Sequence, residues 1–113
     1  VEEDGEFDGY AVCSPDGLVG EDGIIEIKTL SAKFFLSYTE IDEKTGKPKN
    51  YIRPEHMTQC QYNMFITERQ WCDLVYYHSR AGVYIIHIER NEKYIEKIKE
   101  ALREGVQFIE ERL

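Results

Sequence analysis

The segment that most constrains this chain runs from residue 24 to residue 30, where apolar residues surround two charged ones. Its β-branched residues predict a strand, and a strand turns alternate side chains to opposite faces. Glu26 and Lys28 should therefore share one face, while Ile27 points to the other. Since so apolar a strand should be buried, these two charges need a partner. That partner is either a bound metal ion or, in a structural salt bridge, the other charge of the pair.

A tight turn precedes this strand, because Pro15 and Gly17 punctuate the run Ser-Pro-Asp-Gly-Leu over residues 14–18. We expect a strand over residues 7–14, a second turn over 20–23, and hairpin-like pairing with the strand that follows. Asp16 would then lie near the mouth of the hairpin. Two carboxylates and one ammonium converging there would suit a divalent cation with an attacking water beside it.

The rest of the chain predicts a helix from Pro54 to about Glu68, strands over 70–77 and 83–88, and a last helix with Asn91 as its N-cap. Residues 31–54 should be the least regular part. Within them the loop from Asp42 to Asn50 carries a cluster of lysines. This loop is either an exposed tip or a segment that touches a nucleic-acid backbone.

Size and composition are those of one globular domain, with 113 residues, 42% hydrophobic and 12% aromatic. The net charge of −8 opposes binding to a polyanion, because such affinity comes largely from Lys and Arg. No run approaches the roughly 20 apolar residues that span a bilayer. The start at Val1, followed by an acidic run, indicates a piece of a longer polypeptide.

Three cysteines, Cys13, Cys60 and Cys72, lie in apolar segments and form no close pair. A zinc or iron–sulfur site would need such a pair, for example two cysteines separated by two residues. The spacing therefore argues against a metal cluster held by four cysteines. Buried, reduced thiols are expected instead.

Several strings in the order of the chain resemble one family. They are Ser-Pro-Asp-Gly-Leu at 14–18, Glu-Ile-Lys at 26–28, Gln-Cys-Gln-Tyr-Asn-Met at 59–64, Trp71, Ile-Glu-Arg-Asn-Glu-Lys-Tyr at 88–94 and Phe-Ile-Glu at 108–110. Together they resemble the PD-(D/E)XK nucleases of the phage lambda exonuclease and YqaJ-like viral recombinase family. The resemblance covers nearly the whole chain from about Tyr10 onward.

The resemblance implies an α/β fold with a restriction-endonuclease-like core, in which α-helices flank a central mixed β-sheet and the active site lies at one edge. Residues 1–113 would form a single nuclease core domain, the C-terminal portion of a longer chain. The implied activity is metal-dependent exonucleolytic hydrolysis of linear duplex DNA, 5′ to 3′, in phage-type recombination. It also implies a single-strand annealing protein as partner, a homotrimer, and a place in the cytoplasm of a bacterial host.

The same resemblance assigns roles to individual residues. Asp16 and Glu26 would bind Mg²⁺ or Mn²⁺ together with the backbone carbonyl of Ile27. Lys28 would orient or deprotonate the attacking water and offset charge building on the phosphate. Gln59 would be the helix glutamine of the active site.

Two further residues, Ser14 and Gln61, have an alternative or a purely structural explanation. Ser14 matches a residue near the terminal 5′-phosphate, although a serine that satisfies a nearby backbone group explains it equally well. Gln61 lies about 200° around the predicted helix from Gln59, so the two cannot face the same place and Gln61 is expected to be structural.

Three readings stay open. The first is the exonuclease, and the second is a non-catalytic or endonucleolytic DNA-binding module of the same fold. The third, a small α/β protein with a chance motif, ranks last because it leaves the order of the strings unexplained. Relatives also carry an acid and an arginine on an upstream segment that this sequence lacks. We therefore expect the chain alone to bind metal weakly and to cleave poorly or not at all.

Overall fold

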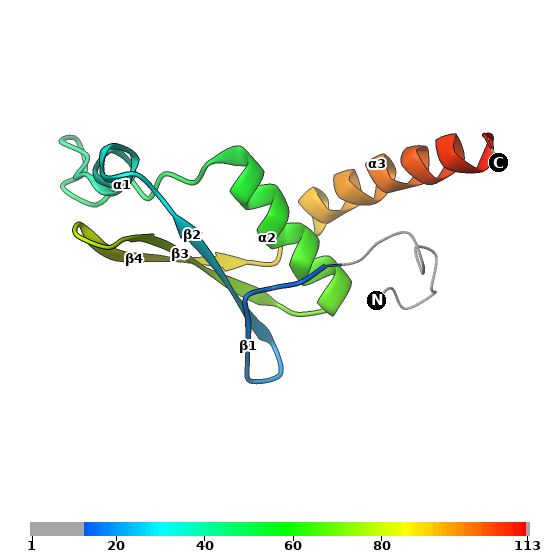
Figure 1. The fold of residues 1–113 in the computed structure, drawn as a ribbon, viewed down its shortest axis with the longest axis horizontal. Helices are drawn as coiled ribbons and strands as arrows, with labels where there is room; N and C mark the ends of the chain where they lie inside the picture. Colours follow the sequence, from blue (N-terminus) through cyan, green and yellow to red (C-terminus); the bar gives the residue numbers. More distant parts are fainter. Residues whose placement is uncertain (1–12, 113) are drawn as a thin grey trace.

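A computed structural model describes residues 13–112, and its elements alternate between strands and helices (Figure 1). They are β1 (Gly17–Val19), β2 (Gly23–Thr29), α1 (Ala32–Thr39), α2 (Pro54–Thr67), β3 (Trp71–His78), β4 (Gly82–Glu89) and α3 (Glu92–Glu110). The sheet has the order β1-β2-β3-β4. The β2–β3 pair is parallel, and the pairs on either side of it are antiparallel. The predicted α/β fold with a mixed sheet is therefore confirmed.

One face of the sheet carries the core, and α1 and α2 pack on that face (Figure 1). The expected alternation along β2 is present: Ile24 and Glu26 are buried, whereas Ile27 between Glu26 and Lys28 is 50% exposed. The core residues from the strands and from the two helices are Ile24, Leu30, Phe35, Cys60, Met64, Cys72, Leu74, Tyr76, Ile86 and Ile88. Glu26 thus shares its face with the hydrophobic core.

The opposite face of the sheet is exposed within the part of the chain that the structure describes. Its exposed apolar side chains are Ile27, Tyr77, Val83 and Ile85. The expectation that the apolar residues of β2 are buried therefore holds for Ile24 but is wrong for Ile27. The apolar content of a strand does not reveal which of its two faces is covered by helices.

The strand expected over residues 7–14 lies mostly outside the described residues. Cys13 and Ser14, which are described, are not in a strand. The strand that pairs with β2 is β1, which follows the turn instead of preceding it. Asp16 lies immediately before β1, at the open end of the β1–β2 hairpin.

The expectation that residues 31–54 are irregular is wrong for α1. Ser31 caps this helix, since its hydroxyl accepts a hydrogen bond from the Phe34 N–H at 3.3 Å. Only Phe35 of the helix is buried, and Phe34 and Leu36 are exposed. The aromatic and apolar run therefore lacks the contrast between faces by which helices are recognised in a sequence.

The two later helices agree with the prediction. Pro54 occupies the first turn of α2, and Asn91 caps α3 by accepting from the Tyr94 N–H at 3.1 Å. Gln61 is buried: it donates to the Glu89 carbonyl at 3.0 Å and accepts from the Asn91 N–H at 2.9 Å. Its structural role is confirmed, because it holds the connection between β4 and α3.

The C-terminal helix α3 starts beside α2 and then extends away from the sheet (Figure 1). Its Ile95 packs with Phe65 and Ile66 of α2 in a second small core. None of the helices in the described residues is long and apolar enough to cross a membrane. Cys60 and Cys72 are buried free thiols, as expected, and Cys13 is a half-buried one.

Gly23 provides a test of how closely β2 and β3 approach. It is the register partner of Trp71, and a methyl group at Gly23 would overlap the Trp71 indole ring. We expect Gly23→Ala to lower the free energy of unfolding by about 1–3 kcal/mol, since the ring must leave its place. Gly105→Ala in α3, where a methyl group meets nothing within 4 Å, is the matched control and should stabilise by up to about 1 kcal/mol. Equal urea midpoints for the wild type and Gly23→Ala would contradict this packing.

Candidate active site

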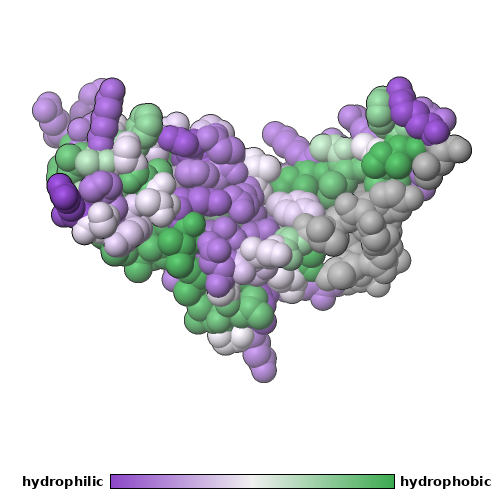
Figure 2. All heavy atoms as spheres, in the orientation of Figure 1, coloured by the Kyte–Doolittle hydropathy of each residue, from purple (hydrophilic) through white to green (hydrophobic). Residues whose placement is uncertain are grey.

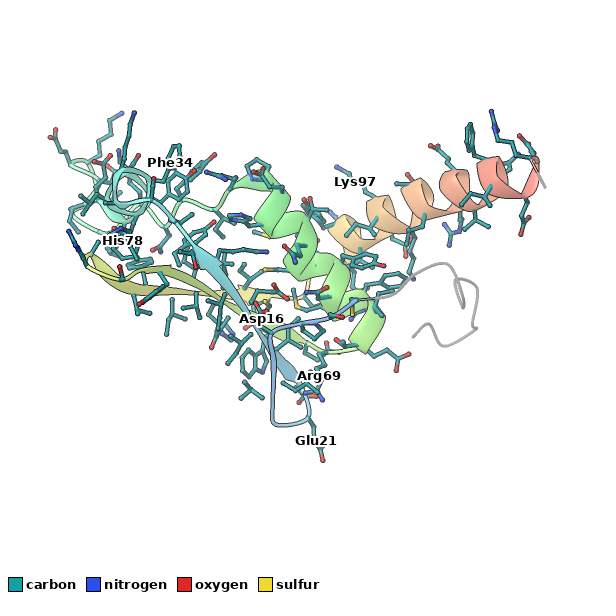
Figure 3. The ribbon with its side chains drawn as sticks, viewed as in Figure 1. Asp16, Glu21, Phe34, Arg69, His78 and Lys97 are labelled. Carbon is teal, nitrogen blue, oxygen red and sulfur yellow. The ribbon has the colours of Figure 1, made fainter. Side chains whose placement is uncertain are left out.

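The site is built around a side chain that replaces a backbone acceptor. The Asp16 carboxylate accepts a hydrogen bond from the Ile27 N–H at 2.7 Å, so it lies against the edge of β2 (Figure 3). The β1–β2 register pairs Gly17 with Ile25, and its extension by two residues places Pro15 opposite Ile27. The carboxylate therefore takes the place that a continuing strand would give to a carbonyl.

The carbonyl of Ile27 also points toward this edge, because the N–H and C=O of one strand residue face the same side. Pro15, its counterpart in the extended register, has no N–H to donate. The proline of the Ser-Pro-Asp-Gly turn thus donates no N–H to the Ile27 carbonyl oxygen, which lies on the same side of β2 as the Asp16 carboxylate. An oxygen in this position can accept a hydrogen bond from another donor or coordinate a cation.

Glu26 occupies the buried side of the same strand. Its side chain is 2% exposed, and its Oε1 accepts from the Asn63 amide of α2 at 2.5 Å. Its other oxygen lies 3.9 Å from the Lys28 ammonium, whose side chain is 25% exposed. The alternative of a structural salt bridge is thus present only as a long contact, and the close partner of Glu26 is Asn63.

The electrostatic surroundings of Glu26 bring Asp16 into the same site. Burial raises the pKa of the Glu26 carboxyl above its usual 4.5, and the negative charge of Asp16 raises it further. Lys28, a hydrogen bond from the Asp16 backbone and the Asn63 amide oppose this shift. Two carboxylates therefore lie close enough to repel each other, and Lys28 lies beside them. The three residues predicted from the sequence come together.

Helix α2 crosses the face of β2 in the opposite direction. This direction decides which strand residue each polar side chain of α2 meets. At its start the His56 Nδ1 lies 2.8 Å from the hydroxyl of Tyr76, the register partner of Lys28. Further along, Asn63 reaches Glu26. Gln59 is half-buried one turn before Asn63 on the same helix face, so it lies between the levels of Lys28 and Glu26.

His56 lies next to the site and is uncharged at neutral pH. Its pKa is lowered by burial first and then by the positive charges of Lys28 and Arg53. Arg53 is held by its own contacts, since its guanidinium donates to the Tyr38 hydroxyl at 2.9 and 3.1 Å. A histidine without charge at neutral pH adds no positive charge next to Lys28.

Sequence reasoning assigned no role to Asn63 and His56. Asn63 could have been found, because it lies four residues after Gln59 and so shares its helix face. His56 has no such signal, since its place depends on how α2 packs across β3. Ser14 is exposed two residues before Asp16, and the described residues give it no contact with Glu26 or Lys28.

The protein ligands for a cation would be few. Within residues 13–112 no group of three or more His, Cys, Asp or Glu side chains is arranged to hold a metal ion. The two carboxylates of Asp16 and Glu26 therefore need the Ile27 carbonyl as a third protein oxygen. All three are hard oxygen donors, the type that Mg²⁺ and Mn²⁺ prefer, so the donor set fits such an ion.

The chain has an α/β nuclease-like fold, in which helices pack on one face of a mixed sheet and two acids converge at its second strand. Residues 5–70 match the YqaJ-like viral recombinase domain family. The chain belongs to this family. A comparison with curated protein sequences gives no match.

Two solved structures of one relative are similar to this chain. The alkaline exonuclease LHK-Exo from Laribacter hongkongensis is 34% identical, with a TM-score of 0.61 over 88% of this chain and 53% of the relative. Its complex with dAMP is also 34% identical, with a TM-score of 0.60 over 88% of this chain and 52% of that one. The chain therefore spans about half the length of the relative, and the family resemblance expected from its motifs is confirmed.

The raised pKa of Glu26 predicts a pH-dependent effect of Glu26→Gln on stability without metal. Protonated Glu26 is favoured in the folded state, so that contribution is present below pH 4.5 and is lost as pH rises through the raised pKa. Because Gln cannot ionise, Glu26→Gln should melt at a higher temperature than the wild type at pH 8. The difference should shrink toward pH 4.5.

Thermal melts in EDTA at several pH values measure this effect. Glu21→Gln, at the exposed tip of the β1–β2 hairpin (Figure 3), is the control and should follow the wild type throughout. A Glu26→Gln variant that is less stable at pH 8, or that differs from the wild type equally at every pH, would contradict the account of Glu26.

Proposed function

We propose that this chain is the catalytic core of a Mg²⁺- or Mn²⁺-dependent exonuclease that hydrolyses linear duplex DNA from 5′ to 3′. The observation that carries the proposal is the convergence of Asp16 and Glu26 beside Lys28. A degenerate copy of the fold would be expected to lose one of these groups. The relative of similar fold is named an alkaline exonuclease, and one of its structures is a complex with dAMP.

The cation would be held by Asp16, Glu26 and the Ile27 carbonyl. Bound there, it would supply Lewis-acid chemistry, polarising a phosphoryl oxygen and making a water molecule more acidic. Asp16 already lies at the edge of β2 through its bond to the Ile27 N–H. Asn63 holds the orientation of Glu26 through its hydrogen bond to Oε1.

Lys28 would act on the phosphate and the attacking water. Its ammonium lies on the same strand face as Glu26, where it can offset the negative charge that grows on the phosphoryl oxygens. Gln59, between the levels of Lys28 and Glu26, could donate from its amide to a water or to the phosphate. Ser14 would contact the terminal 5′-phosphate from the segment that leads into Asp16.

Family membership supports a proposal about the biological process and the assembly in which the chain works. A YqaJ-like viral recombinase domain fits a phage or prophage recombination system, in which one strand is digested and an annealing protein coats the other. We propose a homotrimer in the bacterial cytoplasm as its working form.

Single-turnover digestion is the direct test, because excess protein reveals even weak cleavage. At saturating Mg²⁺ the chain should release nucleotides slowly from linear duplex DNA, faster when the 5′ end is phosphorylated, and none with EDTA. Lys28→Ala should lower the rate about 100-fold or more, since it removes a group that stabilises the developing charge. Lys97→Ala, on exposed α3 (Figure 3), should leave the rate unchanged.

Two outcomes would overturn the proposal. Equal rates for Lys28→Ala and the wild type would remove the proposed mechanism. Digestion of closed circular DNA would instead identify an endonuclease of the same fold.

A further inference from the structure

One end of the molecule carries a surface whose charge differs from the rest of the chain. It is formed by α1, by the loop of residues 40–50 and by the turn between β3 and β4. We call this surface the basic end. Figure 1 shows these segments together at the end opposite α3.

Its charge is positive within an acidic protein. Residues 31–50 and 78–82 contain five basic residues and three acidic ones, whereas the chain as a whole has 14 and 22. The basic residues are Lys33, Lys44, Lys47, Lys49 and Arg80, and the acidic ones are Glu40, Asp42 and Glu43. The basic end thus has the sign that attracts a polyanion, although the chain has a net charge of −8.

Four of these cations are available to a ligand. Lys49 is paired with Glu40. The side chains of Lys33, Lys44, Lys47 and Arg80 are exposed, and within residues 13–112 they form no ion pair. By contrast, Lys28, Arg53, Arg90 and Lys99 each have an acidic partner. The four cations can therefore contact a phosphate without first leaving an acidic partner.

Contacts hold the loop of the basic end against α1 and β4. The loop packs against the body, since Tyr84 of β4 is hydrogen-bonded to Asn50 and the Tyr51 N–H donates to the Tyr38 carbonyl at 3.3 Å. Within the loop, the Asp42 N–H donates to the Lys47 carbonyl at 2.8 Å. Lys44 and Lys47 are thus presented by an ordered turn.

An open pocket of about 530 Å³ separates α1 from the β3–β4 turn. It is lined by Ala32, Leu36, His78, Ser79, Arg80 and Ala81. The His78 Nδ1 accepts from the N–H groups of Arg80 and Ala81 at 3.2 and 3.1 Å, so the ring proton is on Nε2. The pocket therefore offers a guanidinium, a hydroxyl and an imidazole N–H, all donors suited to a phosphate.

The position of the basic end fits a strand that leaves the candidate active site. Three residues of extended chain, about 10 Å, separate Lys28 from Ser31, the cap of α1. Helix α1 packs on the same sheet face as Lys28. Phe34 and His78 mark this end in Figure 3, and in Figure 2 hydrophilic side chains project from it around hydrophobic ones.

We propose that the basic end binds the sugar–phosphate backbone of DNA a few nucleotides from the bond that is cut. Lys33 and Arg80 would contact the nearer phosphates, and Lys44 and Lys47 those further along the duplex. The identity of the polyanion rests on the proposed nuclease function. The surface would supply the affinity that the net negative charge otherwise opposes.

Binding can be measured without cleavage, by fluorescence anisotropy of a labelled linear duplex in EDTA over a range of salt concentrations. The pairs Lys33→Gln/Arg80→Gln and Lys44→Gln/Lys47→Gln should each weaken binding about tenfold at low salt. Each should also reduce the slope of log K against log salt by about 2, because two phosphate contacts are lost. The matched control is Lys93→Gln/Lys97→Gln, which removes the same charge from exposed positions of α3 and should leave the slope unchanged.

The outcomes separate this inference from the proposed function. Lys28→Ala should lower the cleavage rate about 100-fold or more, and it should reduce the salt slope by no more than about 1, because it removes a single phosphate contact. If the wild type binds DNA through the basic end but never cleaves it, the nuclease proposal falls and the inference holds. If the wild type does not bind the duplex, or if the basic-end pairs weaken binding no more than the control pair, the inference is overturned. It also fails if those pairs affect binding to polyglutamate but not to DNA, because the partner would then be an acidic protein.

Discussion

The hydrogen bond from the Ile27 N–H to the Asp16 carboxylate is the interaction on which the rest of the site depends. It exists because Pro15 interrupts the pairing of β1 with β2, so that a side chain and not a carbonyl meets the strand. The same interruption means that the Ile27 carbonyl oxygen receives no N–H from Pro15, its counterpart in the extended register. One proline thus accounts for two of the three oxygens that would hold a cation.

The ionised carboxylate of Glu26 destabilises the folded state. A carboxylate buried on the core face of a sheet, with a second one nearby, is unfavourable when ionised, and its pKa is raised accordingly. Lys28 and Asn63 offset this only in part, because the ammonium is 3.9 Å away and the amide is neutral. A divalent cation would relieve the remaining repulsion, which gives a physical reason why such a site would favour metal.

Local patterns predicted much of this structure. The alternation along β2 placed Glu26 and Lys28 on one face, the turn residues placed Asp16 near them, and the helical angle between Gln59 and Gln61 correctly put the two side chains in different surroundings. Tertiary contacts decided the rest. Asn63 and His56 gain their roles only because α2 runs opposite to β2, and the exposure of Ile27 depends on which face of the sheet the helices cover. Helix α1 was missed because its exposed Phe34 and Leu36 blur the pattern by which a helix is recognised.

The central claim is that Asp16, Glu26 and the Ile27 carbonyl together bind one divalent cation. Anomalous diffraction from crystals of the chain soaked with Mn²⁺ tests it most directly, because it locates the ion among named atoms. The account predicts an anomalous peak within coordination distance of all three oxygens in the wild type, and no peak there in Glu26→Gln. A wild-type peak that contacts neither carboxylate, or no peak at all at saturating Mn²⁺, would contradict it.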